Sequence, residues 1–224
     1  TFIGRFIPYF QLTRKNARTR LTAGTTSQVI NAHRKLRSSH AAAKRELPGD
    51  VMKTPSWELG PEWLYDGVSP DSEETIQGLH STGPSDEPGS DGGLLAIIDE
   101  ASGAEDFKFK AMRGYMTTRN TYWLVMGNPN KPDGQFKEMW DNASDRWERI
   151  QVSAFDVPDH ILSREWIEEE IAYWGEDSPQ VRVRVFGEFP KSGGDYSVFP
   201  LGDLEGAADR LMRNSDGLHL GVDI

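Results

Sequence analysis

Cysteine is absent from all 224 residues of the sequence. This absence excludes a disulfide framework and any metal site built from thiolates. Apolar runs long enough to cross a bilayer are also missing, and no signal peptide opens the chain. The composition therefore predicts an intracellular protein that does not insert into membranes.

Positive charge is scarce over most of the chain, and the formal net charge is −10. This balance argues against a surface that binds nucleic acid everywhere, because affinity for phosphates comes from clustered lysine and arginine. Residues 1–48 are the exception, because they hold a single acid, Glu46. The cationic residues there are Arg5, Arg14, Lys15, Arg18, Arg20, Arg34, Lys35, Arg37, Lys44 and Arg45. The stretch predicts either a locally basic face or a solvated helix whose charge the acidic remainder balances.

A phosphate-binding loop of the P-loop type, a glycine-rich turn ending in Gly-Lys-[Ser/Thr], occurs nowhere in the sequence. The chain begins with Thr1 instead of methionine and stops at Ile224 within a strand-like run, so both ends suggest a fragment. A helical pattern and then a strand follow Thr1, as they follow the loop in a P-loop protein. Thr1 is thus either the last residue of that loop, with its hydroxyl on Mg²⁺, or a terminal residue without a role.

A continuous apolar run, Leu94–Ile98, ends in the adjacent acids Asp99 and Glu100. Such a run predicts a strand buried on both faces, in the middle of a parallel sheet. Acids at the carboxyl end of this kind of strand lie where open α/β sheets bind ligands. In a P-loop ATPase this is the Walker B position, where the first acid holds Mg²⁺ and the second orients or deprotonates water. The alternative is a core strand that ends in a solvated turn.

A second apolar strand is predicted at 122–126, and Asn128 follows it. Consecutive strands usually lie side by side, which would bring Asn128 near Asp99 and Glu100. An amide at this place can donate to a γ-phosphate or to the attacking water. The alternative is an ordinary Asn-Pro turn.

The other patterns alternate strands with helices, which predicts an α/β fold with a mostly parallel sheet flanked by helices. Helices are predicted over 2–10, where Pro8 would kink or shorten the helix, and over 26–45, 105–115, 136–140 and 163–174. Strands are predicted over 16–22, on both sides of a turn within 57–69, and over 149–154, with Ile150 and Val152 on one face. Residues 181–185 alternate like a strand, but Ser178-Pro179 favours a helix, which we prefer. Residues 81–93 have the composition of a loop.

Motifs spread along the chain resemble, in the same order, segments of the large terminase subunits of tailed bacteriophages. They are Thr1–Ile3, Leu12–Arg18, Thr22–Val29, Leu59–Trp63, Ile76–His80, Ile97–Gly103, Gly127–Asn130 and Phe186–Pro190. This resemblance implies a P-loop NTPase-type ATPase domain lacking Walker A at 1–190, a linker at 191–217, and the first strand of an incomplete RNase H-like nuclease domain at 218–224. Gly78 and His80 match a family signature to which we assign no role.

The resemblance also implies an activity and site residues. The complete protein would be an ATP-hydrolysing motor that moves double-stranded viral DNA into a procapsid, joined to an endonuclease. Asp99 would bind the Mg²⁺ of ATP, Glu100 would activate water, and Asn128 would couple hydrolysis to motion. Asp223 would bind the Mg²⁺ or Mn²⁺ ions of two-metal cleavage by the nuclease.

Partners and location follow from the same resemblance. They are viral DNA, the portal protein, the small terminase subunit and further copies in a ring, in the host bacterial cytoplasm and transiently at the portal vertex. Arg113 and Arg119 are candidates for an arginine that acts on a neighbouring subunit, although a solvated helix face explains them equally well.

The chain departs from the family pattern because it lacks the Walker A loop and nearly all of the nuclease domain. We therefore expect this polypeptide alone to bind ATP poorly and to hydrolyse it negligibly. Two alternatives remain: a helicase-like P-loop ATPase of another lineage, and a non-catalytic prophage remnant. The nucleotide sequence on both sides separates the remnant from the motor, because in-frame stops would indicate a remnant.

Overall fold

The structure is a computed structural model that describes residues 2–70, 92–117, 119–142 and 145–190. The chain divides into two compact units, Thr1–Arg149 and Ile150–Ile224. The predicted positions Thr1, Gly78, His80 and Asp223 lie outside the described residues, as do the linker at 191–217 and the strand at 218–224. Most of the predicted loop at 81–93 also lies outside them. The domain boundaries drawn from the sequence therefore stay predictions.

A six-stranded sheet of order β2-β3-β4-β1-β5-β6 forms the centre of the first unit. Its strands are β1 (Arg18–Ala23), β2 (Asp50–Val51), β3 (Ser56–Gly60), β4 (Trp63–Gly67), β5 (Leu94–Asp99) and β6 (Thr121–Val125). Neighbours in the part β4-β1-β5-β6 pair in parallel. Strands β2 and β3 add an antiparallel edge beside β4. The prediction of a mostly parallel sheet with the two apolar strands as neighbours is therefore confirmed.

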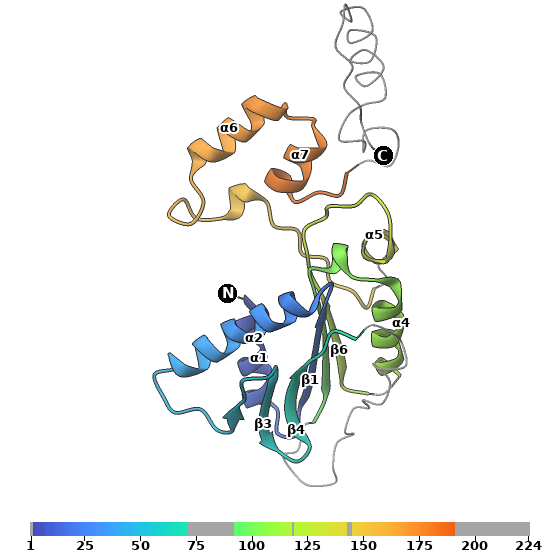
Figure 1. Ribbon diagram of the computed structural model, residues 1–224. Coiled ribbons are helices and arrows are strands. Elements are labelled where there is room, and N and C mark those ends of the chain that lie inside the picture. Colours follow the sequence, from blue (N-terminus) through green and yellow to red (C-terminus); the bar gives the residue numbers. More distant parts are fainter. Residues whose placement is uncertain (1, 71–91, 118, 143–144, 191–224) are drawn as a thin grey trace, which may run out of the picture. The chain divides into compact units, whose positions relative to one another are not determined.

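Helices cover both faces of this sheet, as Figure 1 shows. On one face, α1 (Phe2–Thr13) and α2 (Thr26–Ala41) pack through a core that contains Ile7 and Leu36. On the other face, α4 (Asp106–Tyr115) and α5 (Gln135–Asp141) pack around Ile98 and Met112. The side chains of β5 alternate between these two cores, which is why its sequence is apolar without interruption.

The first two helices differ in length from their predicted bounds. Helix α1 continues to Thr13, well beyond Pro8, which is buried inside it. Helix α2 begins as predicted, because Thr25 and Gln28 form a capping box. It ends at Ala41 instead of reaching Arg45. Leu36 is its last fully buried side chain, so no apolar contact holds further turns against the sheet.

The second unit contains three described helical segments after a short turn, η2 (Ala154–Asp156). They are α6 (Arg164–Trp174), α7 (Pro179–Val181) and the π-helical η3 (Arg182–Phe186). Ser163 caps α6 by accepting a hydrogen bond from the Trp166 amide, and Ile167, at 0% exposure, anchors the helix in a small apolar core. The preference for helix at 181–185 is therefore confirmed.

The strand predicted at 149–154 is wrong. In the structure this segment has no strand, and Ile150 and Val152 expose 73% and 59% of their surfaces. Instead, Ser153 caps η2 through a hydrogen bond from the Phe155 amide. Period-two alternation stabilises a strand only when a neighbour pairs with it and covers its apolar face, and no described strand does so here.

Candidate nucleotide-binding site

The carboxyl ends of β1, β5 and β6 meet at one edge of the sheet. Ala23 of β1 pairs with Asp99, and Ile98 pairs with Val125 of β6. The connection continues past the strands, because the Met126 amide donates to the Ile98 carbonyl at 3.0 Å and the Ala101 amide donates to the Met126 carbonyl at 2.9 Å. The loops after the three strands are thus held against one another at the place where α/β sheets bind ligands.

Glu100 has a backbone conformation that is rare for a residue with a side chain. Its φ of 51° and ψ of 48° lie in the left-handed region, which costs about 1–2 kcal/mol for an L-residue other than glycine. Gly127 packs directly against it, because a Cβ on Gly127 would lie only 2.8 Å from the Ala101 nitrogen. This turn leaves Glu100 exposed while Asp99 stays half-buried, so adjacent carboxylates occupy different environments.

The surroundings of Asp99 make its charged form less favourable than that of a free aspartate. Burial raises the pKa of Asp99, and the nearby charge of Glu100 raises it further. The Glu100 amide, which donates to Asp99 Oδ1 at 3.1 Å, and the cation of Lys35 on α2 oppose this rise in the pKa. A cation bound to Asp99 would relieve both unfavourable contributions.

Asn128 follows β6 at the same edge and is exposed. Its backbone carbonyl accepts a hydrogen bond from the Ser102 hydroxyl, which belongs to the turn η1 (Ala101–Gly103) after β5. The structure thereby joins the loop that carries Asn128 to the loop that carries the acids. The neighbourhood predicted from the sequence is confirmed at the level of these loops.

A buried lysine holds the loop after β1 in place. Lys108 of α4 is 1% exposed, and its Nζ donates to the carbonyls of Ala23 and Gly24 at 3.0 Å each. Glu105 lies 3.2 Å from the same ammonium group. Gly24 in turn approaches η1 so closely that a Cβ on it would lie 2.9 Å from the Gly103 carbonyl oxygen. All three loops at this edge are therefore fixed by close contacts.

The residues at this edge fit a magnesium ion that arrives with a nucleotide. Mg²⁺ prefers oxygen ligands and is usually bound by one or two carboxylates together with substrate phosphates. Asp99 and Glu100 offer such carboxylates, and Asp99 is the one whose pKa indicates an unfavourable buried charge. Within the described part of the chain, no group of three or more acidic or histidine side chains forms a cage for a metal.

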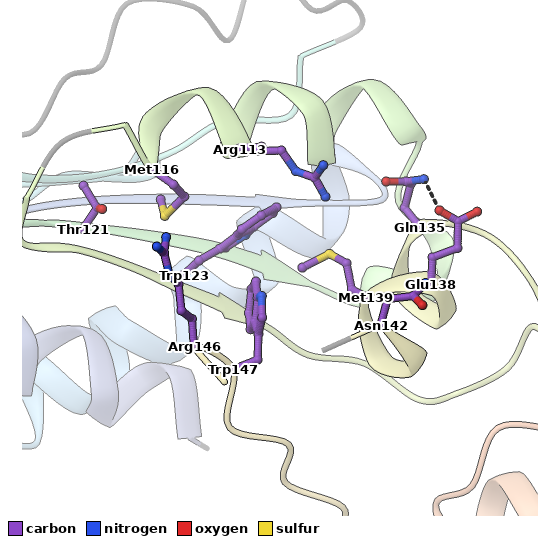
Figure 2. Close-up of a pocket in the computed structure, with 10 residues that line it drawn as sticks. All are labelled: Arg113, Met116, Thr121, Trp123, Gln135, Glu138, Met139, Asn142, Arg146 and Trp147. Atoms are coloured by element: carbon purple, nitrogen blue, oxygen red, sulfur yellow. Dashed lines mark hydrogen bonds between the residues drawn. The ribbon is translucent and has the colours of Figure 1, made fainter. Parts of the chain in front are cut away.

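The two arginine candidates do not lie beside these acids. Arg119 precedes the first residue of β6 and is therefore at the end of that strand opposite to Asn128. Arg113 lines a cavity of about 490 Å³ together with Trp123 and Trp147 (Figure 2). Figure 2 also shows Gln135 and Glu138 among the lining residues, where the Gln135 amide donates to the Glu138 carboxylate at 2.7 Å. None of Asp99, Glu100 and Asn128 lines it.

Sequence reasoning missed Lys35, Lys108 and the packing role of Gly127. One signal for Lys108 is readable in the sequence: it precedes Met112 and Tyr115 by four and seven residues, on the apolar stripe of α4. A lysine on such a stripe must find partners for its charge. No comparable signal exists for Lys35 and Gly127, because their contacts join segments far apart in the sequence.

A mostly parallel sheet with helices on both faces, and with paired carboxylates at the end of an interior strand, is an α/β fold whose acids lie where such sheets bind ligands. No protein-family model matches the chain. It is 28% identical over 162 residues to a probable large terminase subunit of Enterobacteria phage P7, in a match covering 69% of this chain. The chain spans 30% of the length of that relative.

Two solved structures agree with this likeness in fold. The large terminase of a thermophilic bacteriophage, in complex with ADP, superposes with a TM-score of 0.54 at 13% identity, over 75% of this chain and 40% of that one. A point mutant of the large terminase ATPase domain of Thermus phage P74-26 superposes with a TM-score of 0.51 at 16% identity, over 82% and 81%. The chain therefore resembles large terminase subunits in sequence and has the fold of their ATPase domains.

No described helix has the length and apolar character needed to span a membrane.

Proposed function

We propose that this chain is part of an ATP-hydrolysing motor, a large terminase subunit that moves double-stranded viral DNA into a procapsid. The observation that carries the proposal is the position of Asp99 and Glu100. They end an interior strand of the fold found in terminase ATPase domains, beside the loop that follows β6. Neither a helicase of another lineage nor a prophage remnant has an observation in its favour.

Each residue at the edge has a distinct task in this proposal. Asp99, half-buried, binds the Mg²⁺ that accompanies ATP, because its carboxylate is stabilised by a cation. Asp99 would hold this ion, which when bound would supply positive charge against the developing negative charge of the γ-phosphoryl group. Glu100, exposed, orients the attacking water and accepts its proton. Asn128 senses the γ-phosphate, and its loop is tied by Ser102 to the loop that holds the acids.

The proposal also places the phosphate-binding Walker A loop in residues that precede Thr1 in a longer protein. The Thr1 hydroxyl would then be a second Mg²⁺ ligand. The surroundings of β6 support this assignment. Among the described strands, β6 pairs only with β5, and Tyr122 is 41% exposed. The indole nitrogen of Trp123, on the other face, is buried without a hydrogen-bond partner. An edge strand of this kind can pair with a further strand leading to such a loop.

The remaining parts of the proposal rest on the resemblance. They are the linker at 191–217, the nuclease strand with the metal ligand Asp223, and the portal protein, small subunit and neighbouring copies as partners. The terminase structure from the thermophilic bacteriophage contains ADP, which supports an adenine nucleotide as the ligand of the ATPase site.

ATP hydrolysis tests the proposal. We expect negligible turnover by the 224-residue chain and clear turnover by a version lengthened upstream through a Walker A loop. In the longer protein, Glu100→Gln should lower the rate about a hundredfold or more, because general-base catalysis contributes this much. Asp106→Asn, which changes an exposed acid of α4, is the matched control and should leave the rate unchanged. Equal activity of the short chain, or of the Glu100→Gln variant, would contradict the proposal.

A further inference from the structure

The outward face of α2 carries hydrogen-bond donors and no acid. The buried face of the helix consists of Val29, Ala32, His33 and Leu36. Thr26 and Lys35 are exposed polar residues of the helix. Five further exposed polar side chains lie opposite or beside the buried face, namely Ser27, Asn31, Arg34, Arg37 and Ser38. No aspartate or glutamate occurs anywhere in the helix. We call these five exposed residues the α2 donor face.

The cations of this face are not used to hold the fold together. Within the described residues, no salt bridge engages Arg34 or Arg37. Arg34 Nη1 donates to Asn31 Oδ1 at 3.2 Å, which occupies the acceptor of the Asn31 amide and leaves its N–H donors available. A partner that meets this face must therefore supply acceptors and negative charge.

Neighbouring segments extend the positive character of the face. Lys44 and Arg45, which follow the helix, are exposed, and so is Arg5 of α1. Helix α1 crosses α2 closely at Gly4, where a Cβ would lie 2.8 Å from the Lys35 carbonyl oxygen. The attraction of cations to a helix carboxyl terminus does not account for Arg34, because that residue lies in the middle of the 16-residue helix.

We propose that the α2 donor face contacts the phosphodiester backbone of double-stranded DNA. Arginine, serine and asparagine are side chains that bind DNA phosphates, and such contacts position a protein without reading sequence. From Ser27 to Ser38 the helix rises about 16 Å, roughly the rise of five base pairs. Because the whole chain carries −10, a local basic face confines the polyanion to this surface. The choice of double-stranded DNA over another polyanion rests on the proposed function.

Equilibrium binding of the 224-residue chain to a fluorescent duplex of about 20 base pairs and arbitrary sequence, over a series of salt concentrations, tests this proposal. Arg34→Glu/Arg37→Glu should weaken binding about tenfold or more at low salt and reduce the slope of log K against log salt by about two. Arg34→Lys/Arg37→Lys should keep the slope. Circular dichroism and thermal unfolding verify that both variants remain folded.

Lys110→Glu/Arg113→Glu on α4 is the matched control, because it reverses two exposed cations at the same three-residue spacing on a helix. This control should retain the affinity and slope of the unchanged chain. An equal loss in the control would show diffuse attraction only and would overturn the proposal, and so would unchanged binding in the α2 variant. Sedimentation without DNA tests whether the face instead binds a second copy of the chain. If Arg34→Glu/Arg37→Glu abolishes self-association and leaves DNA binding intact, the face binds a second copy and the proposal is overturned. Hydrolysis is not measured, so failure here leaves the proposed ATPase standing.

Discussion

Strands β5 and β6 are neighbours in one sheet, yet their surroundings differ. Every side chain of β5 before Asp99 is buried, and the strand has a parallel partner on each side. In β6 all five residues are partly or fully exposed, and β5 is its only described partner. The acids therefore extend from a strand with two described partners, whereas Asn128 extends from a strand with one. By this comparison, the segment that carries the acids should tolerate substitution less well than the strand that leads to Asn128.

Truncation of paired core residues gives the largest expected contrast between the strands. Ile97 and Leu124 are register partners, but Ile97 is 0% exposed whereas Leu124 is only partly buried. Ile97→Ala should lower the free energy of unfolding by about 3–4 kcal/mol, and Leu124→Ala by about 1–2 kcal/mol. Urea unfolding followed by circular dichroism measures both. Equal losses would show that the two strands are equally constrained.

Gly127→Ala tests the contact between the end of β6 and the turn after β5. The added methyl group would lie 2.8 Å from a backbone nitrogen, so the loop must shift, at a cost of about 1–3 kcal/mol in unfolding free energy. The control is Gly114→Ala on α4, where nothing lies within 4 Å of the added carbon. That change should stabilise the protein by up to about 1 kcal/mol. Equal effects of the two alanines would contradict the close approach of Gly127 to the Ala101 nitrogen.

Substitutions at Glu100 measure the strain of its left-handed backbone conformation. In the left-handed region glycine is unstrained, so Glu100→Gly should be about 1 kcal/mol more stable than Glu100→Ala in denaturant unfolding. The order should reverse at Glu138, inside α5, where alanine is the better helix former. The same order at both positions would contradict the assigned backbone conformation.

The smallest expected effect is the pH dependence contributed by Asp99. Because its pKa is raised in the folded state, the native protein retains this proton longer than the unfolded chain as pH rises. Its contribution to stability is therefore lost from the ordinary pKa of 3.8 upward, through the folded pKa. Asp99→Asn should gain stability relative to the unchanged chain across that window and then level off. Below pH 3.8 the difference in stability between the two proteins should stop changing, which provides an internal control. If Asp99→Asn instead became more stable relative to the unchanged chain as the pH fell through that window, the sign would be refuted.

The sequence predicted the parts of the fold that local patterns specify. An unbroken apolar run identified β5, and the capping residues Thr25 and Ser163 placed the starts of two helices correctly. The adjacency of β5 and β6 followed from the general rule for consecutive strands. These local patterns are sufficient to place the paired acids at the carboxyl edge of the sheet.

Features that depend on distant partners were not predictable in the same way. Residues 149–154 have the alternation of a strand, but no described neighbour pairs with them. Helix α2 stops where its buried contacts stop, which its capping signals do not reveal. The hydrogen bonds from Lys108 to the carbonyls of Ala23 and Gly24 join residues that are 85 and 84 positions apart in the sequence. Such contacts are properties of the folded chain as a whole.

The most direct test of the site is the effect of Mg²⁺ on ATP affinity in the upstream-lengthened protein. Separate roles for the adjacent acids predict that Asp99→Asn abolishes the increase in affinity caused by Mg²⁺. Glu100→Gln, in contrast, should retain that increase while hydrolysis is lost. If the increase survives in Asp99→Asn, or disappears equally in both variants, the assignment of Asp99 to the metal and Glu100 to water is contradicted.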